Sequence, residues 1–198
     1  MMHEEHDMPI PEDVKQWRKA KRAELLAARE AIPADRRRAM SERITEQLID
    51  EFPQLEAMTI GFYWPLRGEF DARVAMLHFR KLGARTALPV VIRKAAPLQF
   101  RLWWPGAPAT VGVYDLPVPE TEVVVPQAVL MPPVGFDARC YRLGYGGGYF
   151  DRTLAAMSPQ PLKIGVAFES SRIETIRPQP HDIPMDLVVT ERGIHRPA

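Results

Sequence analysis

A loop rich in glycine, Gly144 to Gly148, contains four glycines within five residues. An apolar run from Ala128 to Met131 precedes it and predicts a buried strand, and Leu154 and Met157, three residues apart, indicate a helix after it. Backbone N–H groups in such a loop, together with the dipole of the following helix, can hold a phosphate group. We therefore predict phosphate binding here; the alternative is a turn that needs several positive φ angles and binds no ligand.

Charged side chains flank this loop. Arg142 and Arg152 offer cationic donors of the kind that bind phosphate. Asp137 and Asp151 could hold Mg²⁺, a hard cation that carboxylates often bind together with phosphate oxygens. The loop is neither a Walker A motif, because no Gly-Lys-Ser/Thr follows, nor a dinucleotide motif, because Tyr149 stands where the third glycine belongs. The residues predict a phosphate site of another type.

Composition limits the classes of protein to consider. The chain has 198 residues and a net charge of +1, which predicts one domain, placed at 12–194, without a general polyanion-binding surface. Cys140 is the single cysteine, so an internal disulfide is impossible and a reducing, cytoplasmic location is expected. Apolar runs are too short to span a membrane. Residues 1–11 lack a signal-peptide pattern and predict a disordered tail, with metal binding by His3 and His6 as an alternative.

Two basic helices are predicted at the start of the domain. Apolar residues recur at helical spacing over Glu12–Ala31, and a second helix is expected from Pro33 to about Asp50. Arg18 and Arg22 share one face of the first helix, with Lys19 beside them. Such a pair could bind RNA or another protein, but more commonly it covers a hydrophobic core.

A strand, a helix and a second strand follow in order. Met58–Trp64 and Thr86–Ile92 have strand patterns, and a helix is expected between them, which predicts parallel strands. Ligands in such sheets lie beyond the carboxyl ends of the strands. Tyr63, Trp64 and Glu69 fall at one such end and could clamp a flat heterocycle that carries N–H donors. The alternative is a packed aromatic cluster beside a solvated glutamate.

The remaining elements are short. Further strands are expected over 97–104, 111–114, 123–125, 128–131, 163–168 and 187–189. His181 beside Asp182 could form a base or a metal site, although a solvated loop histidine is the commoner case. Asp186, directly before the last strand, is a better metal ligand in this interpretation, and His195 is expected in the C-terminal tail.

The central motif resembles a known family signature. Gly135-Phe136-Asp137 followed by the segment from Arg142 to Arg152 is similar to the signature of 5-formyltetrahydrofolate cyclo-ligases, also called 5,10-methenyltetrahydrofolate synthetases. The resemblance extends from about Lys15 to Glu191. It implies a single three-layer α/β domain with a mostly parallel central sheet, like the fold of sugar-phosphate isomerases and coenzyme A transferases.

The resemblance also implies a reaction. ATP and Mg²⁺ would drive closure of 5-formyltetrahydrofolate to 5,10-methenyltetrahydrofolate, with release of ADP and phosphate. The formyl oxygen would attack the γ-phosphate, and N10 would then attack the formyl carbon as phosphate leaves. Such phosphoryl transfer needs positioning and cationic groups more than covalent help.

Residue roles follow from the same resemblance. It implies catalytic roles for Arg142, Tyr149 and Asp151, with Asp151 and Asp186 as Mg²⁺ ligands. Arg22, with Arg18 or Lys19, corresponds to the basic pair that reaches the ATP phosphates. The implied nucleotide-binding set is Arg18, Lys19, Arg22, Arg142, Leu143, Gly144, Tyr145, Gly146, Gly147, Gly148 and Tyr149. The implied folate-binding set is Tyr63, Glu69, Tyr114, Tyr149 and Phe150.

This chain departs from the family pattern at several positions. Cys140-Tyr141 stands where many members have Gly-Asn, and Gly147 stands where some have lysine. The expected partner is a folate with or without a polyglutamate tail, bound by a monomer or weak dimer, without nucleic acid or membrane. The rival hypotheses are a non-catalytic nucleotide- or RNA-binding module, and an isomerase or transferase of the same fold class.

Overall fold

The computed structural model describes residues 9–198. The predicted tail over residues 1–11, with His3 and His6, lies outside the described residues except for residues 9–11. The centre of the fold is an eight-stranded sheet with the strand order β12-β11-β10-β7-β1-β2-β3-β6. Its strands are β1 (Thr59–Gly61), β2 (Arg85–Val90), β3 (Gln99–Trp103), β6 (Val123–Val124), β7 (Ala128–Met131), β10 (Leu162–Val166), β11 (Leu187–Thr190) and β12 (Gly193–His195).

The middle of the sheet is parallel. Strands β11, β10, β7, β1 and β2 pair in parallel, whereas the pairings at the edges, β12 with β11, β3 with β2 and β6 with β3, are antiparallel. Every residue of β7 and β11 is buried, as expected for parallel strands that are covered on both faces. The predicted α/β class with a mostly parallel sheet is confirmed.

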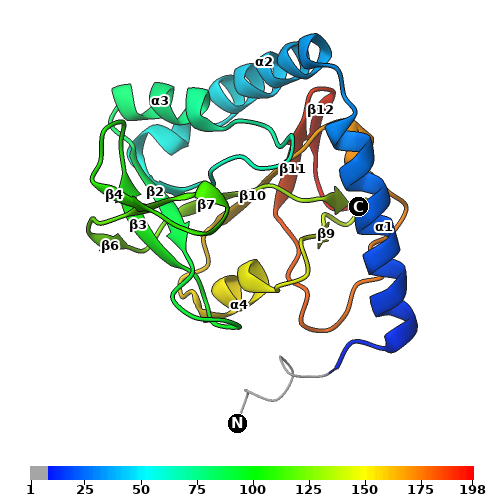
Figure 1. Ribbon diagram of the computed structural model, residues 1–198. Coiled ribbons are helices and arrows are strands. Elements are labelled where there is room, and N and C mark those ends of the chain that lie inside the picture. Colours follow the sequence, from blue (N-terminus) through cyan, green and yellow to red (C-terminus); the bar gives the residue numbers. More distant parts are fainter. Residues whose placement is uncertain (1–8) are drawn as a thin grey trace.

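Helices cover both faces of the sheet. Helices α2 (Ala34–Glu51) and α3 (Arg73–Lys81) lie over one face, α4 (Tyr149–Ala156) over the other, and α1 (Glu12–Glu30) runs along one side of the molecule (Figure 1). Successive side chains of a strand point to opposite faces, so Leu130 packs in the cluster that contains α2, and Val129 in the cluster that contains α4. One apolar strand therefore supplies both layers of the core.

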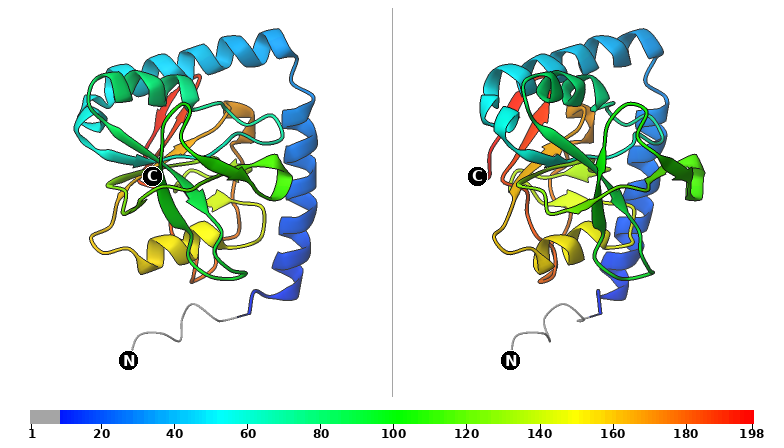
Figure 2. Two further views of the ribbon diagram at one scale, coloured as in Figure 1. Left: turned by 60° about the vertical axis from the view of Figure 1, so that its left-hand side comes forward. Right: turned by 90° about the vertical axis from the view of Figure 1, so that its left-hand side faces the viewer.

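Smaller elements surround the sheet. Two hairpins lie outside it, β4 (Ala109–Val111) with β5 (Pro117–Pro119), and β8 (Gly135–Phe136) with β9 (Arg142–Leu143). The 3₁₀ turns are η2 (Pro53–Ala57), η3 (Val113–Asp115) and η4 (Glu169–Ser171). The β4–β5 hairpin stands out from the body of the molecule (Figure 2). Among residues 9–198, no helix is long and apolar enough to cross a membrane.

Several predicted elements differ from the structure. Strand β1 ends at Gly61, earlier than the predicted Trp64. Residues predicted as a strand over 111–114 instead enter the turn η3, where Tyr114 has a φ of 58°. His195 lies in β12, not in a tail, and its Nε2 is 2.7 Å from the Glu169 carboxylate. Strand β12 was not predicted because its three residues are too few to show the alternation of apolar and polar residues that indicates a strand.

Candidate active site

A cavity of about 800 Å³ lies beyond the carboxyl ends of the central strands. Tyr63 and Trp64, which follow β1, and Pro132, which follows β7, contribute to its wall. Helix α1 and the glycine loop supply much of the remainder. The predicted site residues that line it are Arg18, Lys19, Arg22, Tyr63, Glu69, Arg142, Leu143, Gly144, Tyr145, Gly146, Gly147, Gly148, Tyr149, Phe150 and Asp151. Three predicted residues, Tyr114, Asp137 and Asp186, are not part of this lining.

Glycine occurs at the four positions of the loop for different structural reasons. Gly146 and Gly148 have φ angles of 98° and 65°, a region that side chains disfavour, and Gly148 is the N-cap residue of α4. A Cβ on Gly147 would lie 2.8 Å from the ring of Tyr149, so a side chain there would force the ring to move. Gly144 has neither a positive φ nor a close neighbour. Backbone strain therefore does not explain Gly144, and the open space there permits a close approach by a ligand.

Arg22, on α1, holds the start of this loop. Its Nε donates to the carbonyl oxygen of Gly144 at 2.5 Å, which leaves its terminal amino groups beside Gly146. Burial and then the charge of Arg18 lower the pKa of Arg22. Arg152 supports the other end, since its Nη1 donates to the carbonyl oxygen of Gly147 at 2.6 Å. These two arginines therefore bind opposite ends of the loop, Arg22 from α1 and Arg152 from α4.

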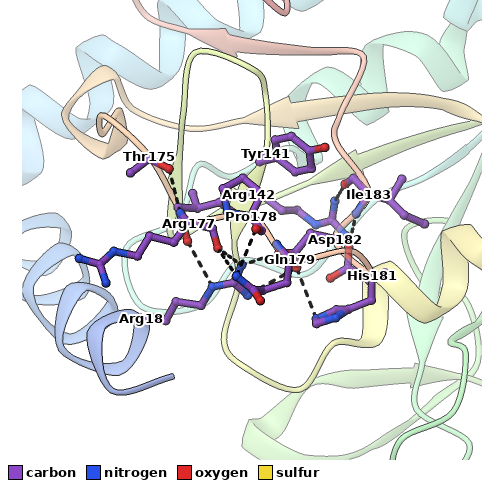
Figure 3. A network of polar contacts seen from close by, with 12 residues as sticks. Arg18, Tyr141, Arg142, Thr175, Arg177, Pro178, Gln179, His181, Asp182 and Ile183 are labelled. Atoms are coloured by element: carbon purple, nitrogen blue, oxygen red, sulfur yellow. Dashed lines mark hydrogen bonds and ion pairs between the residues drawn. The ribbon is translucent and has the colours of Figure 1, made fainter. Parts of the chain in front are cut away.

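Arg18 has a different role from its neighbours. Its guanidinium is buried and donates to the carbonyl oxygens of Ile176 (3.2 Å) and Arg177 (3.0 Å) and to both carboxylate oxygens of Asp182 (Figure 3). It thus anchors the loop before β11 to helix α1. Lys19 lines the cavity and is exposed, and its ammonium makes no hydrogen bond or ion pair within residues 9–198.

The anchored loop also carries His181. The side chain of His181 lines the cavity, and its Nδ1 is buried without a hydrogen-bond partner among the described residues. Its Nε2 lies 3.7 Å from Oδ1 of Asp182, but Asp182 is engaged mainly by Arg18. The structure therefore does not form the isolated His-Asp pair that the sequence suggested.

Arg142 and Asp151 form an ion pair beneath the glycine loop. Nη2 of Arg142 donates to Oδ1 of Asp151 at 2.7 Å, and Nη1 donates to the carbonyl oxygen of Ile183 at 2.6 Å. Burial lowers the pKa of Arg142, and the charge of Asp151 opposes that effect. Oδ1 of Asp151 accepts a second bond from the Ile183 N–H at 3.0 Å, whereas Oδ2 accepts none from the described residues. One carboxylate oxygen of Asp151 is therefore available to a ligand.

The other predicted Mg²⁺ ligands are placed differently. Asp186 accepts the N–H of Lys163 at 2.7 Å, and its Oδ1 lies 3.4 Å from the Lys163 ammonium, away from the cavity lining. Asp137 is buried and accepts N–H groups of Arg139, Tyr141 and Ile176. The structure does not support a metal role for either residue, because both carboxylates are satisfied by the protein itself.

No cluster of three or more His, Cys, Asp or Glu side chains suited to a metal occurs among residues 9–198. Mg²⁺ does not require such a cluster, because it commonly uses one or two carboxylates together with substrate phosphates and water. The free oxygen of Asp151, beside the glycine loop, fits that type of coordination.

Glu69 borders the cavity in a network of donors. Oε2 accepts the N–H of Leu66 at 2.8 Å, and Oε1 accepts the hydroxyl of Tyr145 at 2.6 Å. Nη2 of Arg29 donates to the Tyr145 hydroxyl at 2.7 Å and lies 3.8 Å from Oε1 of Glu69. Burial raises the pKa of Glu69, and the bonds from Tyr145 and Leu66 and the charge of Arg29 counteract it. Glu69 is not the solvated glutamate of the alternative interpretation.

The sequence interpretation did not assign Arg29 to the site. A signal for it was present, because Arg18, Arg22 and Arg29 are separated by four and seven residues and so share one helix face. Nε of Arg29 also donates to the carbonyl oxygen of Arg67 at 3.0 Å, which ties α1 to the loop that carries Glu69.

Aromatic side chains form the apolar walls. The hydroxyl of Tyr63 donates to the carbonyl oxygen of Phe70 at 2.6 Å, and the ring of Phe150 lies 6.0 Å from the guanidinium carbon of Arg142. Trp64 stacks under Arg73 at 4.4 Å. Tyr114 is 78% exposed at the turn of the β4–β5 hairpin and does not reach the cavity, so its folate-binding role stays a prediction that this arrangement does not support.

Comparison with known proteins identifies the family. The family model described as "5-formyltetrahydrofolate cyclo-ligase family" matches residues 14–191. The 5-formyltetrahydrofolate cyclo-ligase of Mycolicibacterium smegmatis is 30% identical over 87% of this chain and 93% of its own length. That of Escherichia coli is 27% identical over 82% of this chain and 93% of its own length.

Solved structures agree with these relatives. The NMR structure of Aquifex aeolicus 5,10-methenyltetrahydrofolate synthetase superimposes with a TM-score of 0.79 at 28% identity, over 90% of this chain and 92% of that chain. A synthetase from Mycoplasma pneumoniae has the same fold, with a TM-score of 0.74 at 24% identity, over 88% of this chain and 98% of that chain. The predicted resemblance is confirmed, and the chain belongs to the 5-formyltetrahydrofolate cyclo-ligase family, a family of ligases.

Proposed function

We propose that this protein catalyses the ATP- and Mg²⁺-dependent closure of 5-formyltetrahydrofolate to 5,10-methenyltetrahydrofolate, releasing ADP and phosphate. The observation that carries the proposal is that one cavity joins a glycine loop flanked by cations to a buried carboxylate and aromatic walls. The glycine loop with its cations suits a polyphosphate, and the carboxylate with the aromatic walls suits a flat heterocycle with N–H donors. Family membership favours this reaction over the isomerase and transferase alternatives.

The nucleotide phosphates would bind at the glycine loop. Lys19 and the terminal amino groups of Arg22 face the cavity with donors to spare, and Arg152 adds a third cation at the start of α4. The N-terminus of α4 adds its dipole to these charges. In this proposal Arg18 acts indirectly, because its donors hold the Ile176–Asp182 loop.

Asp151 is the proposed Mg²⁺ ligand, through Oδ2, and Arg142 fixes the orientation of its carboxylate. Bound Mg²⁺ would neutralise charge on the phosphate oxygens. Asp186 has no part in this version of the site, because Lys163 satisfies it.

The folate would bind toward Glu69. Its carboxylate can accept pterin N–H groups, while Tyr63, Tyr149 and Phe150 supply apolar surface around the ring. With the formyl oxygen positioned against the γ-phosphorus, attack transfers the phosphoryl group and leaves ADP. N10 then attacks the activated formyl carbon, and the original formyl oxygen departs in the phosphate. The residues contribute positioning and positive charge.

Absorbance of methenyltetrahydrofolate provides the test. Purified protein is mixed with 5-formyltetrahydrofolate, and product formation is followed with ATP and Mg²⁺ together and with each omitted in turn. We expect product only when both are present. Folded protein that binds ATP but forms no product would instead support the non-catalytic nucleotide- or RNA-binding module.

A further inference from the structure

Glu69, the proposed folate ligand, is covered in this structure. Its side chain is only 3% exposed although it borders the cavity. The groups around it are the backbone N–H of Leu66 on Oε2, and the Tyr145 hydroxyl and Arg29 guanidinium near Oε1. A substrate N–H group can bind Oε1 at full strength only if one of the groups near that atom withdraws.

Tyr145 is the group that is free to withdraw. It is 45% exposed and lies in the glycine loop, between Gly144 and Gly146. Arg29, in contrast, is 5% exposed in the side chain, belongs to the long helix α1 and is held by the carbonyl oxygen of Arg67. The donor at Oε2 is backbone. Rotation of Tyr145 therefore exposes Glu69 at the smallest structural cost.

The departure of Tyr145 leaves Glu69 with a counter-charge. Nη2 of Arg29 donates to the Tyr145 hydroxyl at 2.7 Å and lies 3.8 Å from Oε1 of Glu69, so Arg29 can turn its donor to the carboxylate. An incoming N–H group replaces the lost O–H donor. The exchange keeps the buried carboxylate hydrogen-bonded throughout.

We propose that Tyr145 is a positioning residue that couples the glycine loop to the folate site: folate displaces its hydroxyl from Glu69 and thereby releases the loop. This inference rests on the proposed function, because it takes Glu69 as the folate ligand. The same loop would hold the nucleotide phosphates, so the affinities for folate and nucleotide become linked. By thermodynamic reciprocity each ligand then changes the affinity for the other by the same factor.

The variant Tyr145→Phe tests this coupling, because it removes only the hydroxyl. Isothermal titration calorimetry measures the Kd of 5-formyltetrahydrofolate with and without a non-hydrolysable ATP analogue. In the variant the substrate no longer has to displace the Tyr145 hydroxyl from Oε1 of Glu69, so we expect binding about tenfold tighter than wild type without nucleotide. The ratio of the folate Kd values measured with and without the analogue should move toward one in the variant.

Tyr141→Phe is the matched control. Tyr141 directly precedes the segment from Arg142 to Arg152, and its hydroxyl makes no hydrogen bond within residues 9–198, so the variant should bind like wild type. Folate binding to Tyr145→Phe that equals or is weaker than wild type overturns the coupling and leaves Tyr145 as a structural support of Glu69. Wild-type protein that binds no 5-formyltetrahydrofolate overturns the proposed function as well.

Discussion

The guanidinium of Arg142 and the carboxylate of Asp151 meet beneath the glycine loop, with Nη2 of Arg142 2.7 Å from Oδ1 of Asp151. The two residues belong to β9 and α4, which the glycine loop joins. The pair therefore closes the base of that loop. It also directs the second oxygen of Asp151 away from protein donors.

Arg142→Ala tests the importance of this pair. The change leaves the partly buried Asp151 and the Ile183 carbonyl without their charged partner, so we expect a loss of about 3–5 kcal/mol in the free energy of unfolding. ATP-dependent turnover should fall by at least about a hundredfold, as with other losses of electrostatic stabilisation. Urea unfolding and the methenyltetrahydrofolate assay measure the two effects. Arg139 is an exposed arginine in the neighbouring turn, so Arg139→Ala should change neither the stability nor the turnover. Undiminished turnover of Arg142→Ala would contradict the role assigned to Arg142.

Asp151→Asn should separate metal binding from folding. The amide keeps an acceptor oxygen for Arg142 but removes the charge that the proposal assigns to Mg²⁺ binding. We expect the Mg²⁺ concentration for half-maximal activity to rise about tenfold or more, which corresponds to a loss of about 1.4 kcal/mol or more in the free energy of Mg²⁺ binding. Asp186→Asn is the comparison, because Asp186 is bound to Lys163 away from the cavity. An equal rise in the Mg²⁺ requirement for Asp186→Asn would restore the metal role that the sequence predicted for it.

Arg18 and Lys19 should respond differently to truncation although they are adjacent. Arg18→Ala leaves the buried Asp182 unpaired, so we expect it to lower the free energy of unfolding by about 3–5 kcal/mol. Lys19→Ala should leave stability within about 0.5 kcal/mol, as for ordinary surface positions, and raise the KM for ATP. Chemical denaturation and initial-rate kinetics distinguish these outcomes. A stable Arg18→Ala protein whose only defect is in the KM for ATP would instead place Arg18 among the direct phosphate contacts.

Glu69 should make stability depend on pH. Burial raises the pKa of Glu69 in the folded protein above its ordinary value of 4.5. A folded-state pKa above the unfolded one means that the folded state binds the proton more tightly, so this contribution to stability is complete below pH 4.5. It is lost as the pH rises through the pKa of the folded protein.

Urea unfolding of wild type and Glu69→Gln, from below pH 4.5 to above the pKa of Glu69 in the folded protein, measures that contribution. The neutral amide does not titrate, so we expect the wild type to lose stability relative to Glu69→Gln as the pH rises. A constant difference between the two proteins over the whole range would show that the pKa of Glu69 is the same in the folded and unfolded states.

Local patterns in the sequence were sufficient for most of the longer elements and for the family. The apolar run of β7, the glycines after β9 and the periodicity of α4 are properties of adjacent residues, and they correctly predicted a buried strand before the glycine loop and a helix after it. The β8–β9 hairpin between β7 and the loop was not predicted, so the loop leaves β9 and not β7. The strand-helix-strand order over 58–92 predicted parallel strands, and the family resemblance implied the α/β class. The signature from Arg142 to Arg152 identified the family, because it is long and contiguous.

The tertiary structure alone decided which partner each charged side chain took. Arg18 pairs with Asp182 across 164 positions of sequence, and Tyr145 covers Glu69 across 76. Asp186 pairs with Lys163 and does not join Asp151 in the cavity lining. These pairings depend on which donors and acceptors lie within reach after the sheet and helices have packed, because a buried polar group is costly unless it is hydrogen-bonded or paired. Helical or strand periodicity carries no information about the distances between residues far apart in the sequence. The sequence therefore predicted most residues of the site but not the contacts that each of them makes.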